Sequence, residues 1–278
     1  MRNIDVIEKE SSGIRKVALG SWRHPRDPST YVEVKLEAQP ALDFISNLNE
    51  KNITLTYFVA KVAAHCIKSM PEMNSVILRG KLHSRKNIDL FISTALNMNG
   101  EKSLSGFVLH DVPNKSLTEI SGFAAGEVNK LRRNECEMTK RIEKRMRQIP
   151  HKLLVPFFRM MEFIQYTLNI APRSWRIPKD RFGSLIITNY GALGIEKAFS
   201  PLLPCAHSAG VMGIGKVFDD VVAKSGKAEI QKSVYLTFTF DHRYFDGLQG
   251  AKFLRRFRKI FEDPQANLDV FQGSNNAD

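Results

Sequence analysis

Between residues 234 and 261 the sequence predicts a strand, a short polar turn and an amphipathic helix, in that order. Apolar residues occupy one face of the strand at Val234, Leu236, Phe238 and Phe240, while Tyr235, Thr237 and Thr239 fall on the other. After Asp246, a residue type that caps helices, apolar side chains recur at helical spacing at Leu248, Ala251, Leu254, Phe257 and Phe261. A strand followed by a helix after a short turn is typical of an α/β fold.

The rest of the chain alternates between strand and helix patterns. Strands are predicted at 30–36, 88–96, 106–109, 184–188 and 209–217, with a loop at 97–103. Helices are predicted at 54–70, at 153–170, and from the capping box Ser116-Leu117-Thr118-Glu119 towards Pro150. This irregular interleaving predicts an α/β sandwich. We find no repeat and no linker, so we expect residues 1–278 to form a single domain.

Charge and cysteine content narrow the setting. The chain has 278 residues, a net charge of +12 and 43% hydrophobic residues, which suits one large core and anionic partners. Met1 to Lys16 has no apolar core of a secretory signal, and Cys66, Cys136 and Cys205 lack metal-ligand spacing. We therefore expect a cytoplasmic protein with reduced thiols and no metal site.

The polar turn carries a residue suited to proton transfer. His242 follows the strand, and the end of a strand places a side chain at the rim of a sheet. Because histidine titrates near neutral pH, it can take a proton from a thiol or hydroxyl and return it to a leaving group. Asp246 can hold the loop through a salt bridge. On this short pattern alone, a histidine that only stabilises the turn is the simpler interpretation.

Longer stretches favour the catalytic interpretation. The run from Asp241 to Ala251, Asp-His-Arg-Tyr-Phe-Asp-Gly-Leu-Gln-Gly-Ala, resembles the catalytic domains of the dihydrolipoyl acyltransferases of 2-oxoacid dehydrogenase complexes. Further segments are similar to that family in the same order, at residues 30–31, 71–74, 104–108, 116–120, 182–191, 199–204 and 209–216. The Asp-His-Arg opening separates the chain from chloramphenicol acetyltransferase and from peptide-synthetase condensation domains, which share only His-x-x-x-Asp-Gly.

The resemblance implies a two-layer α/β sandwich of the chloramphenicol acetyltransferase type, with a mixed sheet, that assembles as a homotrimer. It implies transfer of an acyl group between coenzyme A and a carrier thiol or another small acceptor. His242 would be the general base and Thr188 the hydroxyl that donates to the oxyanion. Asp246 would pair with an N-terminal arginine; Arg15 is favoured, while Arg23 and Arg26 stay open. The supporting residues would be Asp241, Arg243 and Gly247, and coenzyme A would lie near Ser105, Gly106 and Asn189.

Several features depart from the family. The sequence has no lipoyl domain and no lipoylation motif, so we expect no lipoyl group on this chain. The acyl group would come from a lipoyl domain in trans or from an acidic acyl carrier protein. The polar C-terminal tail predicts assembly that stops at the trimer. A non-catalytic trimeric scaffold is the alternative function. Charge alone suggests nucleic acid, but the basic run lacks interleaved aromatic residues, so we expect no nucleic-acid partner.

Residues 130–180 form a predicted basic and amphipathic helical insertion. Residues 130–152 are rich in lysine and arginine, and residues 153–170 form an apolar helix divided by a polar stripe at Arg159, Glu162, Gln165 and Asn169. This segment would recruit an acyl carrier or make peripheral contact with the inner face of a membrane. The alternative is a hairpin packed on the body of the protein. Nearby, Cys205 and His207 are interpreted as structural, and the glycines at 210, 213 and 215 as strand glycines.

Overall fold

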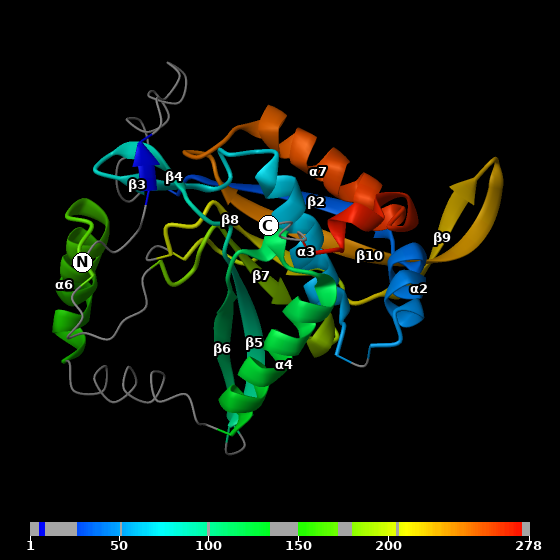
Figure 1. The fold of residues 1–278 in the computed structure, drawn as a ribbon, viewed down its shortest axis with the longest axis horizontal. Coiled ribbons are helices and arrows are strands. Elements are labelled where there is room, and N and C mark those ends of the chain that lie inside the picture. The colour runs from blue at the N-terminus through cyan, green and yellow to red at the C-terminus, as the bar shows by residue number, and fades with distance from the viewer. Residues whose placement is uncertain are drawn as a thin grey trace, which may run out of the picture.

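Two layers, a mixed β-sheet and a set of helices on one of its faces, build the main body of the chain (Figure 1). The structure is a computed structural model that describes residues 6–8, 27–50, 52–98, 101–133, 150–171, 180–203 and 206–273. The arrangement confirms the predicted two-layer α/β sandwich with a mixed sheet.

The large sheet has seven strands, in the order β2-β10-β8-β7-β5-β6, with β9 paired to the far part of β10. The strands are β2 (Ser29–Glu37), β5 (Leu90–Met98), β6 (Glu101–Leu109), β7 (Leu185–Asn189), β8 (Gly210–Ile214), β9 (Phe218–Lys224) and β10 (Lys227–Asp241). The pairs β5–β7 and β7–β8 are parallel and the remaining pairs are antiparallel. The strand β10 therefore lies inside the sheet, between β2 and β8.

Helices α2 (Gln39–Asn47), α3 (Leu55–Lys68), α4 (Leu117–Arg132) and α7 (Gly247–Glu262) form the second layer, with the short turns η1 (Val112–Asn114) and η5 (Gln265–Val270). Aromatic rings fill the space between α7 and β10, where Phe253 stacks on Phe238 with centroids 5.6 Å apart. The alternate residues of β10 that were predicted to share one face, including Phe240, all lie in this core. The sequence pattern therefore identified the buried face of β10.

A smaller sheet and a separate helix lie beside the main body (Figure 1). Strands β1 (Val6–Glu8), β4 (Lys81–Arg85) and β3 (Ser75–Leu78) form this antiparallel sheet. The helix α6 (His151–Glu162) continues into a π-helical turn, η2 (Phe163–Thr167), whose Tyr166 packs against Val76 and Leu78. Strand β3 and the turn η2 thus pack on each other through one small apolar cluster.

The segment formed by α6 and η2 keeps much of its apolar surface in solvent. Phe158 and Phe163 are 49% and 53% exposed, whereas Phe157 and Ile164 are half-buried. The predicted amphipathic helix thus exists, but the described part of the chain does not pack it as a fully buried hairpin. Residues 134–149, which hold most of the predicted basic run, lie outside the described residues. No helix within the described ranges combines the length and the apolar character needed to span a membrane.

The structure corrects two details of the predicted elements. The predicted loop at 97–103 is largely strand, because β5 and β6 form a hairpin paired as far as Met98 and Glu101. The buried face of α7 is also rotated: Leu248 is 64% exposed, while Phe253, which was not predicted to be inward, is buried. The helix starts where it was predicted, but the side chains buried against β10 lie on a neighbouring face of the helix.

Candidate active site

The general base predicted from the sequence, His242, lies immediately after β10. The strand ends at Asp241, whose backbone N–H donates to Ala209 O at 3.0 Å. The next N–H, that of His242, donates to Pro28 O at 3.0 Å. The chain is thus fixed between two other segments at this point. The His242 ring is half-buried, with Nδ1 inside the protein.

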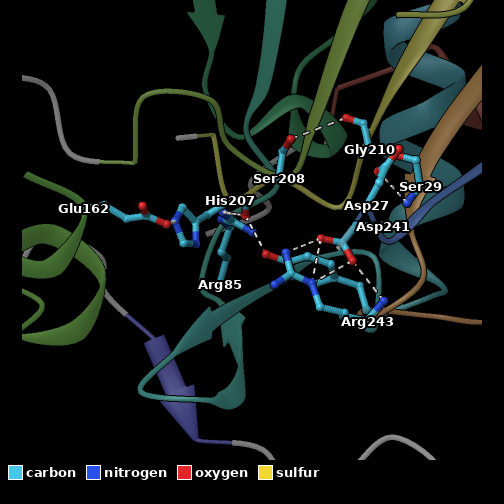
Figure 2. Close-up of polar contacts among 10 residues, drawn as sticks. Asp27, Ser29, Arg85, Glu162, His207, Ser208, Gly210, Asp241 and Arg243 are labelled. Atoms are coloured by element: carbon cyan, nitrogen blue, oxygen red, sulfur yellow. Dashed lines mark hydrogen bonds and ion pairs between the residues drawn. The ribbon is translucent and has the colours of Figure 1, made fainter. Parts of the chain in front are cut away.

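An ion pair between Asp241 and Arg243 closes the turn around His242 (Figure 2). The Asp241 carboxylate accepts from the Arg243 backbone N–H at 2.9 Å and from its guanidinium at 2.6 to 3.1 Å. Its side chain is only 5% exposed, so solvent screens this pair weakly. A charged pair with a fixed fork geometry restricts the turn between the two residues. The two neighbours of His242 therefore hold each other and define the position of the residue between them.

Asp246 caps α7. Its carboxylate accepts from the backbone N–H groups of Leu248 and Gln249, and the Gln249 side chain accepts from the Asp246 N–H. These reciprocal bonds make a capping box. Gly247, predicted as a supporting residue, has open space where a side chain would begin. The N-terminal arginines proposed as partners of Asp246, at positions 15, 23 and 26, lie outside the described residues.

Thr188 lies near the end of β7, on the face of the sheet opposite the helices. Ile187 belongs to the main core beneath the helices, whereas Ile186 packs in a separate cluster on the other face. Because side chains alternate along a strand, Thr188 shares the face of Ile186. In register beside Thr188 are Ser93 on β5 and Gly213 on β8. A side chain at position 213 would meet the Tyr190 ring at 2.4 Å, so glycine is required there.

The fold separates His242 and Thr188 within one chain. Phe240 pairs with Gly210, and Thr188 pairs with Gly213, three residues farther along β8. With ordinary strand spacing, the Cα atoms of Asp241 and Thr188 are roughly 16 Å apart along the sheet. The side chain of Asp241 also lies on the helix-free face, because Phe240 before it points into the core. Within one chain, Asp241 and Thr188 thus share the helix-free face of the sheet but lie far apart on it.

The residues proposed to contact coenzyme A fall on different sides of the sheet. Gly106 pairs with Ser93 and so lies in the same row as Thr188. Ser105 lies on the helix side, because Phe107, its alternate neighbour, packs in the main core. The Asn189 amide already donates to Thr56 Oγ1 at 2.9 Å, and its oxygen accepts from Ala192 N at 3.1 Å. Only Gly106 therefore shares the face of Thr188.

Sequence reasoning missed the residues that flank Thr188. Ser93 and Thr237 lie in the same row across the sheet, Ser93 on β5 and Thr237 on β10 beyond Gly213. Parallel pairing between β5 and β7 joins distant segments, and no local pattern encodes that register. Among the described residues, no three His, Cys, Asp or Glu side chains are grouped to hold a metal ion.

Comparison with known proteins assigns this fold and motif to a family. A family model described as 2-oxoacid dehydrogenases acyltransferase (catalytic domain) matches residues 10–141 and 178–268, well over half of the chain. The chain belongs to this acyltransferase family. The resemblance predicted from the sequence is therefore confirmed. The two matched stretches leave out residues 142–177, which fall within the segment predicted as an insertion.

Comparison with individual proteins gives the same family and the same fold. A mouse dihydrolipoyllysine-residue succinyltransferase component of the 2-oxoglutarate dehydrogenase complex is 32% identical over 43% of this chain and 28% of its own length. The chain thus spans under a third of that relative. The cubic core of a pyruvate dehydrogenase multienzyme complex aligns with a TM-score of 0.64 and 18% identity, covering 94% of each chain. A chloramphenicol acetyltransferase aligns with a TM-score of 0.54 and 12% identity, and the alignment covers 94% of this chain and 100% of that one. These solved structures share the fold of the acyltransferase domain.

Proposed function

We propose that this chain catalyses acyl transfer between coenzyme A and the thiol of an acyl carrier, with His242 as general base and Thr188 as the oxyanion donor. The observation that carries the proposal is the rigid turn that presents His242 at the end of β10 in a member of this family. A histidine with both neighbours tied into an ion pair has a fixed approach direction, which proton transfer requires.

The proposed reaction is an attack of the acceptor thiol on the thioester carbonyl of the donor. The His242 imidazole removes the thiol proton while sulfur forms a bond to the carbonyl carbon. The carbonyl oxygen then carries negative charge and accepts a hydrogen bond from the Thr188 hydroxyl. When this intermediate collapses, the original carbon–sulfur bond breaks and the departing thiolate takes the proton from the imidazolium. One oxyanion donor of this kind lowers the activation free energy by about 3 kcal/mol.

We also propose that the active unit is a homotrimer with each site shared between two subunits. Asp241, the residue before His242, lies roughly 16 Å from Thr188 in one chain. This distance supports a shared site, because His242 and Thr188 must reach the same carbonyl. A neighbouring subunit that places its helix-free sheet face near His242 would supply the Thr188 hydroxyl. Sedimentation velocity at micromolar concentration tests the assembly: we expect the mass of three chains, and a stable monomer with full activity would contradict the shared site.

Loss of activity on removing the imidazole tests the mechanism. The expected result for His242→Ala is that transfer from acetyl-coenzyme A to dihydrolipoamide falls by about 10³-fold or more, while the melting temperature and trimer mass stay unchanged. Thr188→Ala should retain more activity. A folded His242→Ala protein that turns over at the wild-type rate would favour the alternative of a non-catalytic scaffold.

We also propose an acyl carrier and a cellular location for the protein. A lipoyl domain in trans or an acidic acyl carrier protein would present the acyl group, and the protein would be cytoplasmic. The exposed apolar side chains of α6 and η2, including Phe158 and Phe163, support docking of such a carrier or of the inner face of a membrane. Binding of the protein to an acyl carrier protein or to anionic vesicles should weaken in Phe158→Glu. Binding to neither partner at low salt would contradict this role of α6.

A further inference from the structure

An open cavity of about 560 Å³ lies between α6 with its turn η2 and the β3–β4 hairpin. Its walls include Arg79 from the hairpin, Arg159 and Tyr166 from the helical segment, and His207 from the loop before β8. Its size falls in the range of small-molecule sites. None of these residues belongs to the proposed acyl-transfer chemistry, so the cavity requires a separate explanation.

His207 and Tyr166 form the floor of this cavity, and several contacts hold them in place. The His207 ring stacks on the Tyr166 ring with centroids 3.6 Å apart, and its Nε2 contacts Glu162 Oε1 at 2.9 Å. The His207 backbone adopts a φ of +50°, a conformation that costs energy for a residue with a side chain. Its carbonyl accepts from Arg85 Nη2 at 3.0 Å (Figure 2). The same carbonyl accepts from Tyr244 Oη at 2.9 Å. Strain maintained by this many partners is typical of ligand sites.

The buried guanidinium beneath the floor makes it rigid. The Arg85 side chain is 3% exposed and forms two hydrogen bonds with the Asp180 carboxylate, at 2.6 and 3.0 Å. It also donates to the Ser75 carbonyl on the hairpin. One arginine therefore joins the hairpin, the loop of His207 and the segment of Asp180. The cavity is preformed rather than a gap between loosely packed elements.

The charges and apolar surfaces of the walls select a kind of ligand. Arg79 and Arg159 contribute two positive charges, while the carboxylate of Glu162 already faces the His207 ring. Arg79 uses its Nε–H on Thr167 O at 2.7 Å, which fixes the position of the guanidinium. Two arginines suit a carboxylate or a phosphate. Phe163, also in the lining, offers an apolar ring beside these charges, so the complementary molecule is an anion attached to an apolar group.

The origin of the walls indicates a property particular to this chain. Arg159, Phe163 and Tyr166 come from the stretch between the two segments that match the family, whereas Arg79 and His207 come from the matched segments. The cavity exists only because the additional segment packs on the family body. The floor also contacts the catalytic loop, since Tyr244, two residues after His242, donates to the His207 carbonyl.

We propose that this cavity binds a small organic anion, a carboxylate or phosphate monoester joined to an apolar or aromatic group. The anionic end lies between Arg79 and Arg159, and the apolar part lies against Phe163 and Tyr166. The site is separate from the acyl-transfer site and does not depend on the proposed function.

Calorimetric titration of the whole protein tests this assignment. The probes are phenyl phosphate, phenylacetate, the uncharged phenylacetamide and inorganic phosphate. We expect phenyl phosphate or phenylacetate to bind at least about tenfold more tightly than phenylacetamide and inorganic phosphate, because both parts of the ligand contribute. Tighter binding of phenyl phosphate would identify a phosphate ligand, and tighter binding of phenylacetate a carboxylate.

Three variants locate the binding. Arg159→Gln should weaken binding of the better anion by about tenfold or more, because it removes a charge from an exposed helix position without disturbing the core. Phe163→Ala should weaken the aromatic probes and leave inorganic phosphate unchanged. Arg255→Gln, an exposed arginine on α7, is the matched control and should bind as the wild type does.

Two results would overturn the proposal. One is equal affinity for the charged and the uncharged probes, or no binding of any probe. The other is displacement of the anion by coenzyme A together with wild-type affinity in Arg159→Gln. That result would mean that the anion binds at the acyl-transfer site and not in this cavity. Unchanged binding in the presence of saturating coenzyme A supports a separate cavity.

Discussion

A mixture of two inactive chains should recover activity if the acyl-transfer site is shared between subunits. Asp241, which precedes His242, lies roughly 16 Å from Thr188 in one chain, because the register places Thr188 beside Gly213 and Asp241 beyond Gly210. We therefore expect the histidine and the threonine of one site to come from different chains. Combining His242→Ala chains with Thr188→Ala chains creates interfaces where an intact histidine from one chain meets an intact threonine from another.

The expected recovery follows from counting the interfaces. In a cyclic trimer each site takes its histidine from one chain and its threonine from the next. With random assembly at equal amounts, each of these has an even chance of being intact, so about one quarter of the sites regain both groups. Activity should rise to about one quarter of the wild-type value, far above either variant alone when each loses a factor of about 100 or more.

Coexpression of differently tagged chains, with their ratio measured by mass spectrometry, provides the assay. The control mixes wild-type chains with chains that carry both substitutions. A shared site again leaves about one quarter of the sites intact, whereas a site within one chain leaves about one half. No recovery in the first mixture and half activity in the second would refute the shared site.

Three further outcomes are expected. Asp246→Ala should destabilise the fold by about 1 kcal/mol in urea unfolding, because it removes the cap of α7, whereas Asp246→Asn should keep the cap. Lower turnover in a fully stable Asn variant would then indicate a role for the charge. Lys61→Met should cost about 3 kcal/mol of unfolding free energy, since the Lys61 ammonium donates to the carbonyls of residues 112, 113 and 115. Burial lowers the pKa of Lys61 from 10.5 to about 8, so the unfolded chain binds more protons between these values. Wild-type stability should therefore rise with pH relative to Lys61→Met across that window. Cys66, whose pKa burial raises to about 12, should resist alkylation at pH 8 until the protein unfolds, as peptide mapping would reveal.

Local patterns predicted the elements around His242 well. The alternation in β10 and the cap at Asp246 depend on neighbouring residues, and both occur in the structure as predicted. The inward face of α7 was predicted less well, because Leu248 and Phe253 fit helical spacing almost equally. Only the packing of Phe253 on the Phe238 ring decides between these stripes.

Long-range pairing limited the prediction of the sites. The row that joins Ser93 to Thr188 depends on parallel pairing of β5 and β7, for which the sequence offers no local signal. The cavity near His207 was missed for the same reason, since its walls come from three distant segments. A short motif could identify the histidine and threonine through the family, but no motif describes how a separate segment packs on the body.

The central position of β10 constrains when the sheet can form during synthesis. Ser29 at the start of β2 pairs with Asp241 at the end of β10, and β8 also needs β10 as its second neighbour. Until the ribosome has released residue 241, β2 has no partner in the large sheet and one edge of β8 is open. Such high contact order slows folding, and open strand edges favour aggregation. Release of the last strand thus closes the sheet and positions the turn of His242 in one event, so chains interrupted before that point should depend on chaperones to stay in solution.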